Sequence, residues 1–404
     1  MSNEGFRLSP DNLPEYLISR GLTKAGERIT ARELGGGVSN IVLLVEWTDQ
    51  PGLRWVAKQS LGKLRVKDDW RSDRSRVFRE AEAIQALRLV LGDSVPEVIH
   101  VDSENFLFIM SAAPAGSTVW KDSLLAGHVS LAVAQEAGRL LARIMTVAPA
   151  DALRRKFEDR TVFDQLRIDP YYRTTATRNP DVASELSELI AQSWQIQTAL
   201  VHGDYSPKNM LVPCPRDEAP GPSCPGDLLV GMGVSPVKLD PGQEPALSEA
   251  KDGHASLVEA GRFHKALNQP GARLVGGDHI FLIDFEVVHW GDPAFDSGFL
   301  LNHLVLKALH RPRFCQLYVE AARQFWKALI TELGPQAGSD FEYMTLRHLG
   351  ALLLARIDGK SPVEYIRDES TKERVRRVAS CILLERPRRL DEALALVLAE
   401  TGEG

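Results

Sequence analysis

The strand-like patterns of this chain are gathered near its N-terminus, and helix-like patterns dominate the rest. Residues 28–60 read as strands on either side of three consecutive glycines, Gly35-Gly36-Gly37, and a second strand pair covers residues 97–110. Later segments, such as LAVAQEAGRLLARIM and the residues from Asp296 onward, have apolar residues at helical spacing. Because strands and helices are segregated along the chain, we predict an α+β fold with two lobes.

One helical pattern lies between the two strand pairs. Val77, Ala81, Ile84 and Leu91 recur at the spacing that places side chains on one face of a helix. Glu80 falls on this apolar face. A carboxylate on an inward face needs a partner, so we expect a polar or charged group beside Glu80.

The loop SAAPAGS, which follows the second strand pair, marks the boundary between the lobes. We predict a β-rich N-lobe with one helix at residues 1–110, a hinge at 111–116 and a larger, mainly helical C-lobe at 117–404. Residues 213–278 differ from the rest, because 9 prolines and 10 glycines fall in these 66 positions. Such a content without a repeat is typical of low-complexity segments, so we predict a flexible insertion between two strands.

Composition excludes several classes of protein. A net charge of −6 and a pI near 6.0 argue against nucleic acid as the main partner. The first residues lack the pattern of a signal peptide, and no apolar run is long enough for a membrane span. The 4 cysteines form no CxxC pair, which argues against zinc and disulfide frameworks. We therefore expect a cytoplasmic protein without nucleic-acid or membrane partners.

The most informative motif is His202-Gly203-Asp204 followed by Asn209, together with Asp284 in FLIDFE. Phosphoryl transfer needs one carboxylate to orient the attacking hydroxyl and accept its proton, and oxygen ligands for the metal that bridges the phosphates. Asp204 on a loop that leaves a strand suits the first role. Asn209 and Asp284 suit the second, because Mg²⁺ prefers such oxygen ligands.

Two alternatives compete with this interpretation. A single aspartate in such a position is more often a turn or cap residue, although the complete set makes that explanation weak. A hydrolytic metal centre at His202 and Asp204 would need more histidines at ligand spacing, and His279, His289 and His303 supply no HxH or HxxxH pair.

The two motifs resemble those of the aminoglycoside phosphotransferase and choline kinase family, which has a protein-kinase-like fold. The resemblance rests on LVHGDYSPKNMLV and LIDFEVVHWGDPAFDSG, and it extends from about Gly35 to Asp368 without the insertion. It implies that Asp296, in the second motif, supports the catalytic loop.

The same resemblance implies an ATP site built by the glycine turn, the next strand, the helix and the linker between the lobes. In it Lys58, in WVAK, would hold the α- and β-phosphates, with Glu80 as its partner. The linker, residues 108–113, would bind the adenine through its backbone. The predicted ATP-binding residues are Gly36, Gly37, Ser39, Lys58, Glu80, Met110 and Ala112.

Some segments within this family pattern are most similar to methylthioribose kinases, namely APAGSTVWKDSLLAG, FDQLRIDPYYRTTATRNPD and ARIDGKSPVEYI. The last one implies that Arg356 binds the substrate, although an ordinary helix-surface arginine is the alternative. SPKN and DFE stand where methylthioribose kinases have a Thr-Gly-Ser stretch and DPE. This departure argues against methylthioribose itself.

Together these observations predict an ATP- and Mg²⁺-dependent kinase whose partner is a small molecule with a hydroxyl group, such as a sugar, an aminoglycoside or an amino alcohol. The alternative is a non-catalytic nucleotide-binding protein that keeps the fold. The intact set of Lys58, Glu80, Asp204, Asn209 and Asp284 argues against it.

Overall fold

The computed structural model of the protein describes residues 6–35, 39–63, 72–213 and 279–402. The predicted insertion and two of the predicted ATP-binding glycines, Gly36 and Gly37, therefore lie outside the described residues, apart from Pro213 at the start of the insertion.

The N-terminal region is built on an antiparallel sheet. Apolar side chains on both faces of its central strands are buried, because a short helix covers one face and a long helix the other. In the described part of the chain the sheet has five strands in the order β1-β2-β3-β5-β4. They are β1 (Ile29–Glu33), β2 (Asn40–Trp47), β3 (Arg54–Ser60), β4 (Val98–Asp102) and β5 (Leu107–Ser111).

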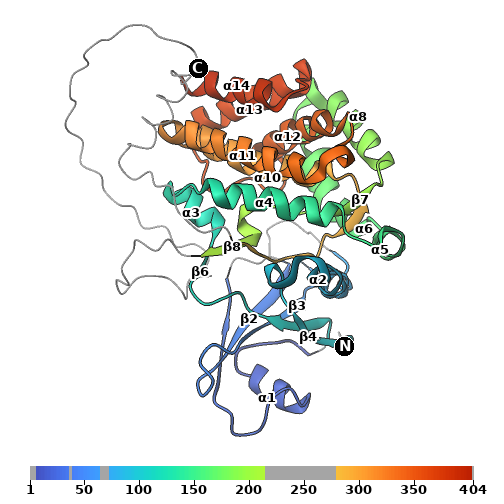
Figure 1. The fold of residues 1–404 in the computed structure, drawn as a ribbon, viewed down its shortest axis with the longest axis vertical. Coiled ribbons are helices and arrows are strands. Elements are labelled where there is room, and N and C mark those ends of the chain that lie inside the picture. Colours follow the sequence, from blue (N-terminus) through green and yellow to red (C-terminus); the bar gives the residue numbers. More distant parts are fainter. Residues whose placement is uncertain (1–5, 36–38, 64–71, 214–278, 403–404) are drawn as a thin grey trace, which may run out of the picture.

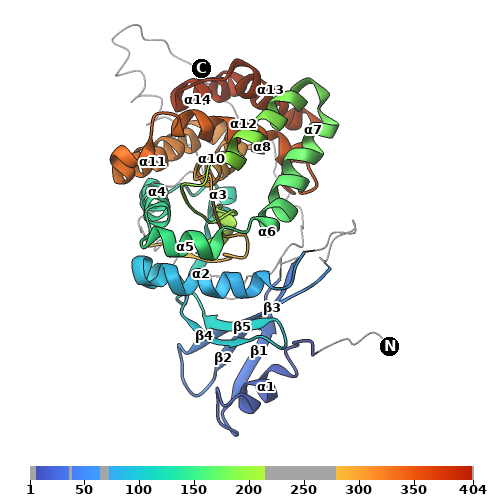
Figure 2. The ribbon, with the colours of Figure 1, turned by 90° about the vertical axis from the view of Figure 1, so that its right-hand side faces the viewer.

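The long helix α2 (Arg76–Leu91) packs on β3, β4 and β5 and lies between the sheet and the helices of the C-lobe (Figure 2). It is the helix that the sequence predicts, and Glu80 lies on its buried face. The short helix α1 (Leu13–Ser19) was not predicted. Its Leu13, Tyr16 and Leu17 pack on the other face of the sheet.

The C-terminal region is mainly helical, and its helices stack above the sheet (Figure 1). Helix α4 packs along α11, while α12 lies between α10 and α13. Its helices are α3 (Trp120–Ala126), α4 (Leu131–Met145), α5 (Ala150–Phe157), α6 (Thr161–Phe163), a π-helical stretch (Asp164–Arg173), α7 (Thr174–Arg178), α8 (Ala183–Gln195), α10 (Ala294–His310), α11 (Cys315–Leu333), α12 (Phe341–Asp358), α13 (Glu369–Glu385) and α14 (Leu390–Thr401). None of the helices in the described residues is long and apolar enough to cross a membrane.

Two small antiparallel sheets lie where the two regions meet. One pairs β7 (Ala199–Val201) with β10 (His289–Gly291), and the other has the order β6-β8-β9. Its strands are β6 (Ser117–Val119), β8 (Met210–Pro213) and β9 (Phe281–Leu282). The loops that leave β7 and β9 carry the predicted catalytic and metal-binding residues.

The predicted α+β class, with a β-rich N-lobe and a mainly helical C-lobe, is confirmed. The N-lobe contains α1 in addition to the one helix that we predicted. β5 ends at Ser111, the first residue of the predicted hinge, and residues 112–116 lie between β5 and β6, which begins at Ser117. The domain boundaries themselves stay a prediction.

Candidate active site

The loop that carries Asp204 has a fixed backbone. Gly203 adopts φ +77°, and a Cβ atom at this position would lie 2.7 Å from the carbonyl oxygen of Val287, so only glycine fits. The carboxylate of Asp296 accepts hydrogen bonds from the backbone N–H groups of His202 (2.6 Å) and Gly203 (2.9 Å). Burial raises the pKa of Asp296 to about 7. Asp296 thus supports the loop, as the resemblance implies.

His202 ties this loop to the segment before Asp284. Its Nδ1 accepts from the backbone N–H of Asp204 at 3.2 Å, and its Nε2 lies 3.2 Å from the carbonyl oxygen of Ile283. A carbonyl oxygen can only accept, so the proton of the neutral ring lies on Nε2. Burial lowers the pKa of His202 to about 4, which keeps the ring neutral at physiological pH. The neutral imidazole thus holds the loop and the segment before Asp284 together, and each of its ring nitrogens already has a hydrogen-bond partner.

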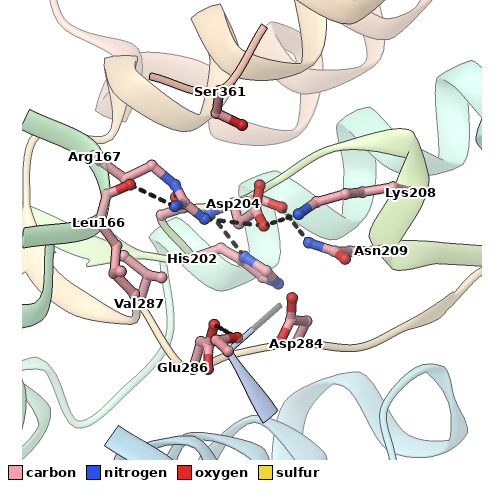
Figure 3. A network of polar contacts seen from close by, with 12 residues as sticks. Leu166, Arg167, His202, Asp204, Lys208, Asn209, Asp284, Glu286, Val287 and Ser361 are labelled. Carbon is pink, nitrogen blue, oxygen red and sulfur yellow. Dashed lines mark hydrogen bonds and ion pairs between the residues drawn. The ribbon is translucent and has the colours of Figure 1, made fainter. Parts of the chain in front are cut away.

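The carboxylate of Asp204 is buried and held by two cations (Figure 3). Its Oδ2 lies 2.9 Å from Nη2 of Arg167 and 2.7 Å from Nζ of Lys208. Although burial disfavours the charge, these two residues together hold the pKa of Asp204 below its usual value. Its Oδ1 has no hydrogen-bond partner in the described part of the chain. An ionised carboxylate with one free oxygen can accept the hydrogen bond of an incoming hydroxyl.

Sequence reasoning missed both cations. Lys208 lies four residues after Asp204, in SPKN, and this spacing could have been noticed. Arg167 comes from the π-helical stretch, 37 positions before Asp204, and also donates from Nε to the carbonyl oxygen of Gly203 at 2.6 Å. No local pattern connects Arg167 with the loop.

Asn209 and Asp284 lie on the two segments that meet beside Asp204 (Figure 3). The Nδ2 group of Asn209 donates to the backbone carbonyl of Asp204 at 2.9 Å, which leaves the side-chain oxygen as the available metal ligand. Asp284 adopts φ +71°, a conformation that aspartate tolerates better than most residues but that still costs energy. Strained backbone of this kind is common at functional sites.

Lys58 on β3 connects Glu80 with Asp284. Its Nζ lies 2.7 Å from Oε2 of Glu80 and 2.6 Å from Oδ1 of Asp284. Burial opposes the charge of the ammonium, but Asp284 and Glu80 outweigh it and raise the pKa of Lys58 above its usual value. Burial likewise opposes ionisation of Asp284, and Lys58 nevertheless lowers its pKa. The structure thus brings together Lys58 and Glu80, the pair expected from the sequence.

A third acidic residue, Glu286, was also missed, although it is part of the same DFE motif. It accepts hydrogen bonds from Oγ of Ser39 (2.9 Å), Nδ2 of Asn40 (2.8 Å) and Nε of Arg76 (3.2 Å). Oxygens of Glu80, Asp284 and Glu286 all lie within 4.8 Å of one another. Together with the side-chain oxygen of Asn209, this group of oxygen donors fits Mg²⁺.

The other residues predicted to bind ATP or the substrate lie around this group of carboxylates. Ser39 donates to Glu286, and Met110 is buried in β5. The backbone N–H of Ala112 already donates to the carbonyl oxygen of Arg54 at 3.0 Å, so its carbonyl is the group left for an adenine. Arg356 on α12 does not reach Asp204. Its Nη1 donates to the hydroxyl of Tyr171 at 3.1 Å.

The chain matches one protein-family model and is similar in sequence to two curated proteins. Residues 30–221 match the family model described as the phosphotransferase enzyme family. Two curated rice proteins (Oryza sativa subsp. japonica) are similar. Methylthioribose kinase 2 is 25% identical over 215 residues, which are 46% of this chain and 50% of that protein. Methylthioribose kinase 1 is 32% identical over 131 residues, 31% of this chain and 30% of that protein. The chain thus spans half the length or less of the curated relatives it matches.

Two solved structures are also similar over most of their length. A choline/ethanolamine kinase family protein from Mesorhizobium loti is 14% identical with a TM-score of 0.45, and 96% of this chain and 98% of that chain are covered. An ethanolamine kinase from Plasmodium vivax is 12% identical with a TM-score of 0.46, and 96% and 93% are covered.

The matched region begins in β1 and includes Lys58, Glu80, Asp204 and Asn209, which the structure brings to one place. The resemblance that we predicted from the two motifs is confirmed. Residues 30–221 of this chain match the model of the phosphotransferase enzyme family.

Proposed function

We propose that this protein is an ATP-dependent kinase that transfers the γ-phosphoryl group to a hydroxyl of a small molecule. The observation that carries the proposal is the position of Lys58, which contacts both Glu80 from α2 and Asp284 from the segment after β9. An ammonium at this place can hold the phosphates of a nucleotide beside the oxygen ligands of a metal.

In the proposed reaction the acceptor hydroxyl donates its hydrogen bond to Oδ1 of Asp204. As the acceptor oxygen forms its bond to the γ-phosphorus, the bond from that phosphorus to the bridging oxygen breaks, and ADP leaves with the electron pair. The proton of the hydroxyl passes to Asp204. Arg167 and Lys208 keep the carboxylate oriented and ionised until the hydroxyl arrives.

Asn209, Asp284 and Glu286 would hold Mg²⁺, which when bound would neutralise the charge of the phosphates. The residues supply oxygen ligands of the type that this ion prefers, and the cluster of carboxylates has Lys58 and Arg76 beside it as counter-charges. Lys58 would position the nucleotide, and buried Glu80 would keep Lys58 in place.

The test is ADP formation by the full chain with ATP and Mg²⁺ over a panel of sugars, sugar acids, amino alcohols and aminoglycosides. Asp204→Asn should lower transfer by about 10²–10⁴-fold, the usual contribution of a general base, while ATP binding stays within a few-fold of the parent. Arg377→Gln, a change in an exposed ion pair with Glu400, is the matched control and should leave both unchanged. Full turnover by Asp204→Asn would remove Asp204 from the mechanism, and absence of acceptor-dependent ADP formation would leave only nucleotide binding.

A further inference from the structure

The side of Asp204 that faces away from Asp284 is unusually rich in positive charge for an acidic protein. Figure 3 shows Asp284 on one side of Asp204 and Ser361 on the other. Ser361 follows α12, and its side chain accepts a hydrogen bond from Nη1 of Arg356 at 3.0 Å. The ring of Tyr171 lies between two guanidinium groups, 5.6 Å from that of Arg167 and 5.7 Å from that of Arg356. An unbroken row of contacts therefore leads from Asp204 to Arg356.

Further cations lie behind this row. Lys307 on α10 is completely buried, and its Nζ lies 5.5 Å from the ring centre of Tyr365. Within the described residues, this ammonium donates to the carbonyl oxygen of His303 at 3.1 Å and forms no ion pair, although Glu364 and Asp122 act on it from a greater distance. Lys121 comes from α3, which packs on the turn that carries Asn209. It forms an ion pair with Glu364.

Two of the cations in this region lack a carboxylate at ion-pair distance. The cations are Arg167, Lys208, Arg356, Lys307 and Lys121, and the carboxyl groups that act on them are Asp204, Asp284, Glu286, Glu364 and Asp122. Arg167 and Lys208 share Asp204, and Lys121 pairs with Glu364, while Asp122 is exposed at the surface. Arg356 and Lys307 thus have no carboxylate partner within the described residues. Burial and the neighbouring Lys121 lower the pKa of Lys307 to about 7.

Arg356 has a free edge suited to an acidic group. Its Nη1 serves the hydroxyl of Tyr171 and both oxygens of Ser361, whereas its Nε is buried without a hydrogen-bond partner in the described residues. Nε and Nη2 together form one of the faces through which arginine binds a carboxylate or a phosphate with two parallel hydrogen bonds. Arg356 is half-buried and Lys307 is fully buried. A cation that is shielded from water without a counter-ion is unfavourable, so such an arrangement is expected where a ligand supplies the negative charge.

We propose that the acceptor carries an acidic group, a carboxylate or a phosphate, which binds the free edge of Arg356 while its hydroxyl lies at Asp204. This inference rests on the proposed function and narrows its acceptor to anionic polyols such as sugar acids or sugar phosphates. Lys307 and Lys121 add positive potential behind the acidic group. Cationic acceptors, such as choline or an aminoglycoside, are repelled by the same charges.

The test compares acceptors that differ only in the acidic group. ADP formation by the full chain is measured with glycerate against glycerol, gluconate against glucitol, and glucose 6-phosphate against glucose, with choline and kanamycin as cations. In at least one pair the acid should have a kcat/KM at least tenfold above that of its neutral partner. A preference for the acid in the first two pairs indicates a carboxylate, and a preference in the third pair indicates a phosphate. Equal or better use of a neutral or cationic acceptor would overturn the inference while the proposed kinase activity stands.

Variants locate the effect. Lys307→Met keeps the length and apolar stem of the side chain, and Arg356→Lys keeps the charge but loses the two parallel hydrogen bonds. Both should raise KM for the preferred acid about tenfold or more, and the ratio of kcat/KM for the acid to that for its neutral partner should fall by a similar factor. Lys327→Met, on the exposed face of α11, is the control and should change neither. An unchanged acid preference in both folded variants would refute the assignment.

A binding measurement separates the two proposals. If no acceptor yields ADP, the proposed function fails. The anion site is then judged by thermal protection, at constant ionic strength, with gluconate and glucose 6-phosphate as probes. Protection of the parent and of Lys327→Met, but not of Lys307→Met, supports the site. Equal protection of all three proteins, or of none, overturns it.

Discussion

Glu286 gives the sharpest test of how the two lobes are held together. Its side chain is 8% exposed and joins the catalytic segment of the C-lobe to Ser39, Asn40 and Arg76 of the N-lobe. Ser39 is the second residue after Gly37, Asn40 begins β2, and Arg76 begins α2. We predict that Glu286→Ala destabilises the protein and weakens ATP binding together.

The size of the effect follows from the partners that remain. Removal of one member of a buried ion pair costs about 3–5 kcal/mol, because the other charge stays buried without its partner. The guanidinium of Arg76 is fully buried, but it also donates to backbone carbonyl oxygens, for example those of Ser39 (2.5 Å) and Leu61 (2.8 Å). We therefore expect the low end, about 3 kcal/mol. Because Ser39 and Asn40 also lose an acceptor, KM for ATP should rise about tenfold, the equivalent of about 1.4 kcal/mol.

Urea unfolding at 25 °C in metal-free buffer measures the stability, so that a lost metal ligand does not contribute. Glu400→Ala is the matched control. It breaks the pair with Arg377, which has the similar distance of 2.9 Å but is largely exposed, and should cost below about 1 kcal/mol. If the two variants lose the same free energy of unfolding, or if Glu286→Ala loses under about 1 kcal/mol, the buried pair of Glu286 with Arg76 stabilises the protein no more than an exposed pair does. Our reasoning would then be wrong.

Three further outcomes are expected. Asp284→Asn should raise the Mg²⁺ concentration for half-maximal activity more than Asn209→Ala does, because it removes a charged ligand, and Mg²⁺ titrations that overlay the parent would contradict the metal assignment. Lys58→Met and Glu80→Gln should each raise KM for ATP, and the double variant should cost less than the sum, whereas strict additivity would separate the pair. Burial lowers the pKa of His289 to about 3, so the unfolded chain binds a proton at a higher pH than the folded protein does, and the free energy of unfolding falls as the pH drops below about 6.5. Between about pH 6.5 and about pH 5 His289 should lower the free energy of unfolding by about 2 kcal/mol. Urea unfolding of His289→Phe at these two pH values should therefore show a smaller pH-dependent loss of stability than the parent, and an equal loss in both proteins would contradict the prediction.

Sequence reasoning succeeded where neighbours in the chain determine the geometry. Asp204 and Asn209 lie five positions apart on one loop, so their spacing alone predicts that the two residues lie close together. In the structure the side chain of Asn209 donates to the backbone carbonyl of Asp204. Helical periodicity put Glu80 on the buried face of α2, and the family resemblance implied Lys58 as its partner. The local patterns thus gave the positions of Asn209 and Glu80, and the resemblance gave the pairing.

The remaining parts of the site depend on contacts between distant segments. Glu286 meets Ser39 and Asn40 across about 246 positions, and nothing near the DFE motif indicates these partners. Arg167 lies in a π-helical stretch, whose spacing does not follow the 3.6-residue period on which helix faces are predicted. Helix α1 has only seven residues, which is too short for a periodic pattern to be recognised.

The position of residues 214–278 between two paired strands leads to a last prediction. β8 and β9 are antiparallel, with Met210 opposite Leu282 and Leu211 opposite Phe281. Strands in this register bring their ends together, so a hairpin of a few residues can join them. Replacement of residues 214–278 by a glycine-containing linker of about five residues should therefore leave the fold intact.

Loop closure favours the shorter link by about 0.6 kcal/mol for each halving of length, so chain entropy alone predicts no loss of stability. A Gly/Ser segment of the native length in the same place is the control, because it keeps the length and removes the sequence. A cooperative transition within a few degrees of the parent, with ATP still bound, is expected for both variants. If both lose stability or ATP binding, the native residues contribute contacts to a lobe or to the nucleotide. If only the variant with the short linker loses stability or ATP binding, the ends of β8 and β9 need a longer connection than their register implies. The pairing of Met210 with Leu282 would then be a poor guide to the length of chain required.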